Sequence, residues 1–115
     1  MEDTILIAEK TLKLAMQVGF KVAQSTIFIT YKGDFENEEQ QEMEGVMQSV
    51  LHKYILENHN LYIDVRISSQ SKEFFFYIME TKNEYYTVHH SNGTYKTYEL
   101  ALEDGLIKAL ELIIK

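Results

Sequence analysis

The spacing of apolar residues changes from a helical period to a strand period near the middle of the chain. Between Met43 and Asn60 apolar residues recur every three or four positions, which predicts an amphipathic helix. From Leu61 to Ser68 apolar and polar residues alternate, which predicts a half-buried strand. Since the helix leads directly into the strand, we expect their apolar faces to pack together. The helical stripe consists of Met43, Val46, Met47, Val50, Leu51, Tyr54 and Ile55.

The remaining faces and the end of this predicted helix are polar. Asn60 favours a helix end because Asn tolerates the left-handed backbone conformation, and we expect His59 to terminate the helix with a hydrogen bond. The acidic run before Met43 suits the positive end of a helix dipole. The face opposite the apolar stripe carries Glu44, Gln48, His52, Lys53 and Glu57.

Two further helices are predicted, one at each end of the chain. Asp3 to Val18 has an apolar stripe, with Asp3 or Thr4 as a cap and Gly19 as a stop signal. Thr97 to Ile114 begins with a capping threonine. Its Gly105 lies in a row of small residues with Ala101 and Ala109, which predicts that this helix approaches a sheet closely.

The strands predicted around the central helix complete an α+β fold. Thr26 to Tyr31 and Tyr85 to His90 are rich in β-branched and aromatic residues. Phe74 to Thr81 is apolar on both faces, which is typical of a central strand. We expect residues 1–115 to form a single domain. The predicted architecture is a small antiparallel sheet of three to four strands with helices packed mainly on one face, in the order α-(β)-α-β-β-β-α.

The net charge of −7 is local rather than general. Residues 34–44 contain six acids and no base, whereas the other 12 acids nearly balance 11 Lys and Arg. Because phosphate contacts need clustered bases, the charge makes nucleic acid an unlikely partner. A solvated helix entry is the favoured interpretation of the acidic run, and the alternatives are mimicry of nucleic acid or binding to a basic partner. The candidate acidic patch is Asp34, Glu36, Glu38, Glu39, Glu42 and Glu44.

The chain contains no cysteine and no apolar run of membrane-spanning length, so we expect a cytoplasmic protein without disulfides. Catalytic patterns are also missing: no serine lies in a nucleophile elbow and no glycine-rich phosphate loop is present. Asp64 and Glu80 could pair as carboxylates, but an exposed ion pair between Asp64 and Arg66 is the better interpretation. The four histidines lack metal-ligand spacing. We therefore predict no catalytic residues, no metal and no cofactor.

Residues 47–63 read Met-Gln-Ser-Val-Leu-His-Lys-Tyr-Ile-Leu-Glu-Asn-His-Asn-Leu-Tyr-Ile, and residues 97–106 read Thr-Tyr-Glu-Leu-Ala-Leu-Glu-Asp-Gly-Leu. These two segments resemble a family of small uncharacterised proteins of phages and prophage-like elements of gut Bacteroidetes. In that family a Gln-Ser-Leu-Leu-Gln-Lys-Trp-Leu-Arg-Glu helix runs into His-Asn-Ile-His-Ile, with Tyr54 here in place of Trp and Leu56 in place of Arg. Residues 97–106 resemble its Thr-Tyr-Glu-Glu-Ala-Leu-Glu-x-Gly-Leu ending, with Leu100 in place of a capping-box Glu. The resemblance implies a mobile-element origin and no particular activity. The matches in the first segment are Gln48, Ser49, Leu51, Lys53, Glu57, His59, Asn60 and Ile63.

The clearest candidate for function is a cluster of aromatic residues. If the apolar side of the strand Leu61–Ser68 faces the helices, the other side of the sheet presents aromatic groups, and such a cluster is typical of an interface. The N-terminal helix or first strand could instead cover this face. Otherwise it would bind a second copy of the chain or a foreign protein. The candidate interaction face is Tyr62, Phe75, Tyr77, Met79 and Tyr85.

These patterns favour a small non-enzymatic accessory or protein-interaction protein, with a homodimer as one form. The alternative is a nucleic-acid-associated module, because the order helix, three strands, helix is shared with double-stranded RNA-binding domains. Against that function, Lys96 is the one basic residue at the start of the last helix and Glu99 follows it. A small enzyme ranks third.

Overall fold

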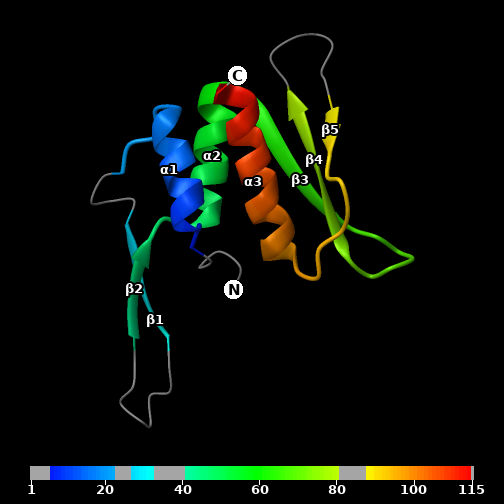
Figure 1. Ribbon diagram of the computed structural model, residues 1–115, viewed down its shortest axis with the longest axis horizontal. Coiled ribbons are helices and arrows are strands. Elements are labelled where there is room, and N and C mark those ends of the chain that lie inside the picture. The colour runs from blue at the N-terminus through cyan, green and yellow to red at the C-terminus, as the bar shows by residue number, and fades with distance from the viewer. Residues whose placement is uncertain (1–5, 23–26, 33–40, 81–87, 115) are drawn as a thin grey trace.

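Two antiparallel sheets and three helices make up the parts of the chain that the computed structural model describes, residues 6–22, 27–32, 41–80 and 88–114. The α+β prediction is confirmed: helices pack against a three-stranded antiparallel sheet. Figure 1 shows the helices together on one side of that sheet. The elements are α1 (Glu9–Gln17), β1 (Phe28–Lys32), β2 (Gln41–Gly45), α2 (Gln48–His59), β3 (Leu61–Ile67), β4 (Phe74–Glu80), β5 (Val88–His90) and α3 (Tyr98–Ile114).

The larger sheet is a meander with β4 in the centre. Its strand order is β3-β4-β5, and both neighbours pair antiparallel with β4. The predicted alternation is confirmed in the first part of β3, where Leu61 and Ile63 are buried, and in Phe76 and Ile78 of β4, but Ile67 at the end of β3 is 55% exposed. The four buried side chains belong to the hydrophobic core, which also contains Leu51, Ile55, Leu102, Leu106 and Leu110 from the helices.

Helix α3 lies across the sheet at close range. It contacts both β3 and β4, while α2 packs against β3 and α1 packs against α3. A Cβ atom at Gly105 would lie 2.7 Å from Cγ2 of Ile63. The close approach predicted from the small residues of this helix is therefore confirmed. The predicted cap is also present, because the Leu100 N–H donates to Thr97 Oγ1 at 3.1 Å.

The predicted start of the central helix at Met43 is wrong. Residues Gln41–Gly45 form β2, which pairs antiparallel with β1 from Phe28↔Gly45 to Lys32↔Gln41. The backbone stays extended beyond β2, since Met47 forms a bridge with Leu6. Met43, Val46 and Met47 fit a helical period, but strand pairing uses the backbone groups here and overrides it. Figure 1 shows that the β1–β2 hairpin projects from the helices, away from the larger sheet.

The first helix is shorter than predicted. The same bridge between Leu6 and Met47 keeps the chain extended up to Ala8, so α1 begins at Glu9. The proposed caps Asp3 and Thr4 lie outside the described residues. The stop signal is confirmed: Gly19 follows the helix with φ +102°, a conformation that favours glycine.

The end of α2 is formed by Asn60 rather than by the ring of His59. Asn60 has φ 58° and ψ 33°, the predicted left-handed conformation, and its N–H donates to Leu56 O. The prediction that His59 ends the helix with a hydrogen bond is not supported, because its buried Nε2 has no partner among the described residues. The His59 ring instead meets Tyr54 edge-on at 5.6 Å between centroids.

Candidate functional site

The outer face of the β3–β4–β5 sheet, turned away from the helices, collects the predicted aromatic residues. In the strand register, Tyr62 lies opposite Met79 and Arg66 lies opposite Phe75. Neither α1 nor β1 covers this face, since α1 lies in the helical layer and the hairpin projects elsewhere (Figure 1). Tyr85 lies outside the described residues. The outer face therefore consists of Tyr62, Asp64, Arg66, Phe75, Tyr77, Met79, Val88 and His90.

Tyr77 is the centre of this outer face. Its ring meets Phe75 edge-on at 5.3 Å and His90 edge-on at 4.8 Å between centroids. The guanidinium carbon of Arg66 lies 5.8 Å from the centroid of the same ring, within cation–π range. These contacts half-bury Tyr77, while Tyr62 at one edge and Val88 at the other each keep 38% of their surface exposed.

The charged groups on the outer face form the predicted ion pair. Arg66 Nε donates to Asp64 Oδ2 at 2.9 Å, and this bond together with the charge of Asp64 raises the pKa of Arg66. Asp64 and Glu80 do not form a carboxylate pair: Asp64 lies opposite Tyr77 on the outer face, whereas Glu80 lies opposite Leu61 and binds His89 at 3.2 Å. The outer face is thus aromatic with a balanced charge pair.

The four histidines occupy separate environments. His52 and His59 lie on α2, and the adjacent His89 and His90 point to opposite faces of β5, as the strand period requires. Within the described ranges, no three His, Cys, Asp or Glu side chains come together as metal ligands.

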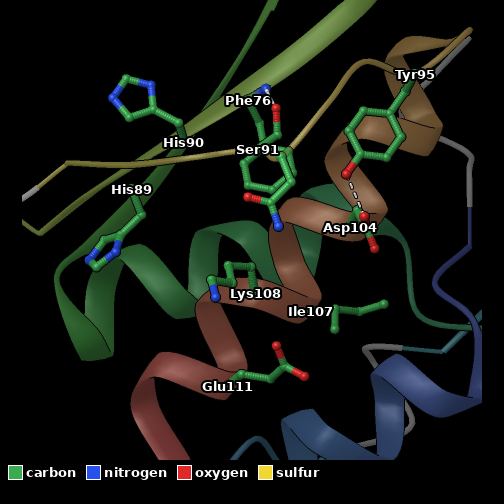
Figure 2. Close-up of a pocket in the computed structure, with 10 residues that line it drawn as sticks. Phe76, His89, His90, Ser91, Tyr95, Asp104, Ile107, Lys108 and Glu111 are labelled. Atoms are coloured by element: carbon green, nitrogen blue, oxygen red, sulfur yellow. Dashed lines mark hydrogen bonds between the residues drawn. The ribbon is translucent and has the colours of Figure 1, made fainter.

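A groove of about 430 Å³ separates β5 from α3 (Figure 2). It has a polar lining, in which the Tyr95 hydroxyl donates to Asp104 Oδ2 at 2.5 Å. Burial and this hydrogen bond raise the pKa of Tyr95 to about 12. The hydroxyl of Ser91 donates to Gly93 O at 2.8 Å and accepts from the Phe76 N–H at 3.4 Å. Among the described residues both hydrogen-bond partners of the Ser91 hydroxyl are backbone groups, and neither is a base that could activate it as a nucleophile.

A buried polar cluster joins the three helices, and the sequence pattern did not reveal it. The carboxylate of Glu103 on α3 accepts hydrogen bonds from the Thr11 hydroxyl, from Gln48 Nε2 at 3.0 Å and from the Ala8 N–H at 2.9 Å. Thr11 is fully buried and Gln48 is 2% exposed, so Gln48 is part of the interior although its predicted place was the polar face opposite the apolar stripe. Gln48 also donates to Glu99 O. This Glu103 cluster fixes α1 and α2 to α3.

His52 was also assigned to the polar face of α2, but the structure places it against the free edge of β3. Its Nε2 accepts the backbone N–H of Ile63 at 3.1 Å, and its ring lies 5.2 Å from the ring of Tyr62. Burial lowers the pKa of His52 below the ordinary value of 6.5. Only the neutral ring can accept this hydrogen bond.

Replacement of His52 is expected to remove part of the pH dependence of stability. Because folding favours the neutral ring, its stabilising effect is complete above pH 6.5 and is lost as pH falls from 6.5 through the lowered pKa of the folded state. His52→Phe should cost about 1 kcal/mol at neutral pH, since the Ile63 N–H loses its acceptor. Urea unfolding of both proteins between about pH 5 and 8 measures the difference. A slope of stability against pH that is the same in His52→Phe as in the wild type would contradict this assignment.

The candidate acidic patch does not enter a helix. Glu42 and Glu44 belong to β2, where they pair with Tyr31 and Ile29 of β1. The other members, Asp34, Glu36, Glu38 and Glu39, lie outside the described residues.

No protein-family model matches the chain, and no curated protein or solved structure is significantly similar to it. Across the described ranges, none of the helices combines the length and apolarity that crossing a membrane would require.

Proposed function

We propose that this chain is a small interaction protein that binds another protein molecule through the outer face of its three-stranded sheet. One observation carries the proposal: the described helices all lie on the opposite side of the sheet (Figure 1), and the strand register gives the outer face mainly aromatic and apolar residues. Aromatic residues and arginine are enriched at protein interfaces, and Tyr77 with Arg66 supplies both. The motif resemblance supports an accessory protein of mobile-element origin.

A second copy of the chain is the partner that this face favours. An interface around a two-fold axis must be complementary to itself. The outer face meets that condition, since it carries both members of an ion pair, Asp64 and Arg66, beside the central ring of Tyr77. Two such faces can stack as in a β-sandwich, with each Arg66 near the partner's carboxylate.

The size of the face predicts a weak dimer. Strands β3 and β4 have seven residues each and β5 has three, which corresponds to a projected area of roughly 300 Å² at ordinary strand dimensions. Stable complexes bury about 800 Å² per partner. Association through the outer face alone should therefore be reversible and depend on concentration.

Tyr77→Lys is expected to abolish the concentration-dependent rise in mass in sedimentation velocity experiments. The lysine would lie opposite Asp64 within the sheet, so strand pairing is preserved, but two lysines would meet at the centre of the dimer. Met16→Asp is the matched control, because Met16 is an exposed apolar residue (55%) on α1. A wild-type chain that stays monomeric at millimolar concentration would contradict the homodimer. If Met16→Asp lost association and Tyr77→Lys kept it, the dimer interface would lie on the helices and not on the outer face.

A nucleic-acid-associated module is the second candidate, because α2, β3–β5 and α3 reproduce the order and one-sided layering of double-stranded RNA-binding domains. The start of α3 disfavours it, since Glu99, Glu103 and Asp104 follow Lys96 there and phosphate contacts need bases. Titration with duplex RNA at low salt separates the two candidates: binding that falls steeply with added salt would favour the module.

A further inference from the structure

The loop between β5 and α3 contains one dipeptide whose chemistry the proposed function does not use, Asn92–Gly93. Both residues are exposed. A Cβ atom placed on Gly93 would meet no other atom within 4 Å, so the loop is open on that side. Within the described part of the chain, the backbone N–H of Gly93 donates no hydrogen bond.

Backbone hydrogen bonds to the sheet hold the loop on both sides of this dipeptide, and within the dipeptide the Gly93 carbonyl accepts the Ser91 hydroxyl at 2.8 Å. The Ser91 N–H donates to Phe76 O at 3.0 Å, and Tyr95 exchanges two backbone hydrogen bonds with Phe74, each of 2.8 Å. The segment 92–94 is therefore held at both ends. Among the described residues, its own backbone N–H groups donate no hydrogen bond to the sheet. Because glycine has no side chain and wide conformational freedom, its nitrogen can turn toward the preceding side chain.

We propose that Asn92 is a site of spontaneous deamidation. The backbone nitrogen of Gly93, after losing its proton to hydroxide, attacks Cγ of Asn92 and forms a new N–Cγ bond. The Cγ–Nδ2 bond breaks, and the amide nitrogen leaves as ammonia after taking up a proton from water, which leaves a five-membered succinimide. Water then opens the ring at either carbonyl, giving aspartate or isoaspartate. No redox change occurs, and water is the one co-reactant consumed.

The other described asparagines provide a comparison within the same molecule. Asn58 lies inside α2, where its Nδ2 donates to Tyr54 O at 3.0 Å. Asn60 is held in the left-handed conformation and is followed by Leu61, which is 3% exposed. In both cases regular structure fixes the following peptide nitrogen. Of the five asparagines in the sequence, Asn92 is the one followed by glycine.

The reaction would change the groove between β5 and α3. Asn92 and Lys108 both line that groove, and the Lys108 ammonium has no ion-pair partner among the described residues. Deamidation replaces a neutral amide by a carboxylate in the groove that Lys108 also lines. The isoaspartate product also adds a methylene group to the backbone between the two anchors of the loop. Aged protein is therefore a mixture of the asparagine, aspartate and isoaspartate forms at position 92, and the latter two add a negative charge to the groove.

The test is ageing of the purified folded chain in mildly alkaline buffer, followed by peptide mapping with mass spectrometry and enzymatic methylation of isoaspartate. Asn92 should deamidate about an order of magnitude faster than Asn58 and Asn60, and Gly93→Ala should slow it by a similar factor because a side chain hinders the attack. Asn92→Gln should remove the labelled product. Gly93→Ala has open space for its methyl group, so folding is preserved.

Two results would overturn the proposal. The first is a rate at Asn92 no faster than at Asn58 or Asn60 in the folded chain. The second is a rate at Asn92 that rises by more than an order of magnitude when the chain is unfolded in urea, since the native loop would then hold Asn92 in an unreactive geometry. A rate at Asn92 that is similar in the folded and urea-unfolded chain supports the proposal.

Discussion

Glu103→Ala should lower the free energy of unfolding by about 3 kcal/mol, the cost of leaving buried hydrogen-bond donors without a charged acceptor. The carboxylate accepts from Thr11, which is fully buried, and from Gln48, which is 2% exposed. Gln48 keeps its second bond to Glu99 O, whereas the Thr11 hydroxyl loses the acceptor that the Glu103 cluster provides. Urea unfolding at neutral pH measures the loss. The wild type and the variant are fitted with the same slope of unfolding free energy against urea concentration.

Glu111→Ala is the matched control for this substitution. Glu111 is an exposed carboxylate on the same helix and should change stability by no more than about 0.5 kcal/mol. Glu103→Gln should fall between the two, because the amide oxygen can accept one donor while its NH2 faces another. If Glu103→Ala and Glu111→Ala proved equally stable, the Glu103 cluster would not be what holds α1 to the fold.

Gly105→Ala should destabilise the protein by about 2 kcal/mol, even though alanine is the better helix former. The added methyl group would lie 2.7 Å from Cγ2 of Ile63 and 3.4 Å from Cγ of Phe76. Helix α3 would have to move away from the sheet to relieve this overlap, which would loosen the contacts of Leu106 and Ala109, both fully buried. Thermal or urea unfolding gives the change directly.

Lys108→Ala tests helix propensity alone, since Lys108 is exposed on the same helix and should be nearly neutral. A double-mutant cycle with Ile63→Ala isolates the contact, because Ile63→Ala removes Cγ2. The two substitutions together should cost less than the sum of their separate effects. If the two changes in unfolding free energy were strictly additive, contact with Ile63 would not be what sets the distance between α3 and the sheet.

The parts of the fold that could be predicted from the sequence are those in which local pattern and burial agree. Leu61 and Ile63 alternate with outward residues and are buried, and Thr97 caps α3 where a cap was expected. The close contact at Gly105 could be predicted because glycine inside a helix destabilises it, so its presence there indicates that a side chain would not fit. The shared outer face of Tyr62 and Tyr77 followed from strand parity alone.

The parts that could not be predicted depend on residues far apart in the chain. Strand β2 forms because β1 is available to pair with it, and a short run with two or three apolar residues fits either period. Gln48 was placed on a polar face because periodicity records hydrophobicity and not hydrogen bonding. Its partner Glu103 lies 55 residues away, so no local pattern could reveal that this amide is buried.

The contact between His52 and Ile63 also limits how the molecule can aggregate. Edge strands with free backbone donors recruit strands from other molecules, and unlimited growth into a ribbon needs two such edges. Strands β3 and β5 form the two edges of the larger sheet, and the imidazole of His52 occupies the Ile63 N–H on the β3 edge. A strand added at the β3 edge would have to displace this imidazole before it could pair with Ile63. Acidification would protonate His52 and uncover the second edge.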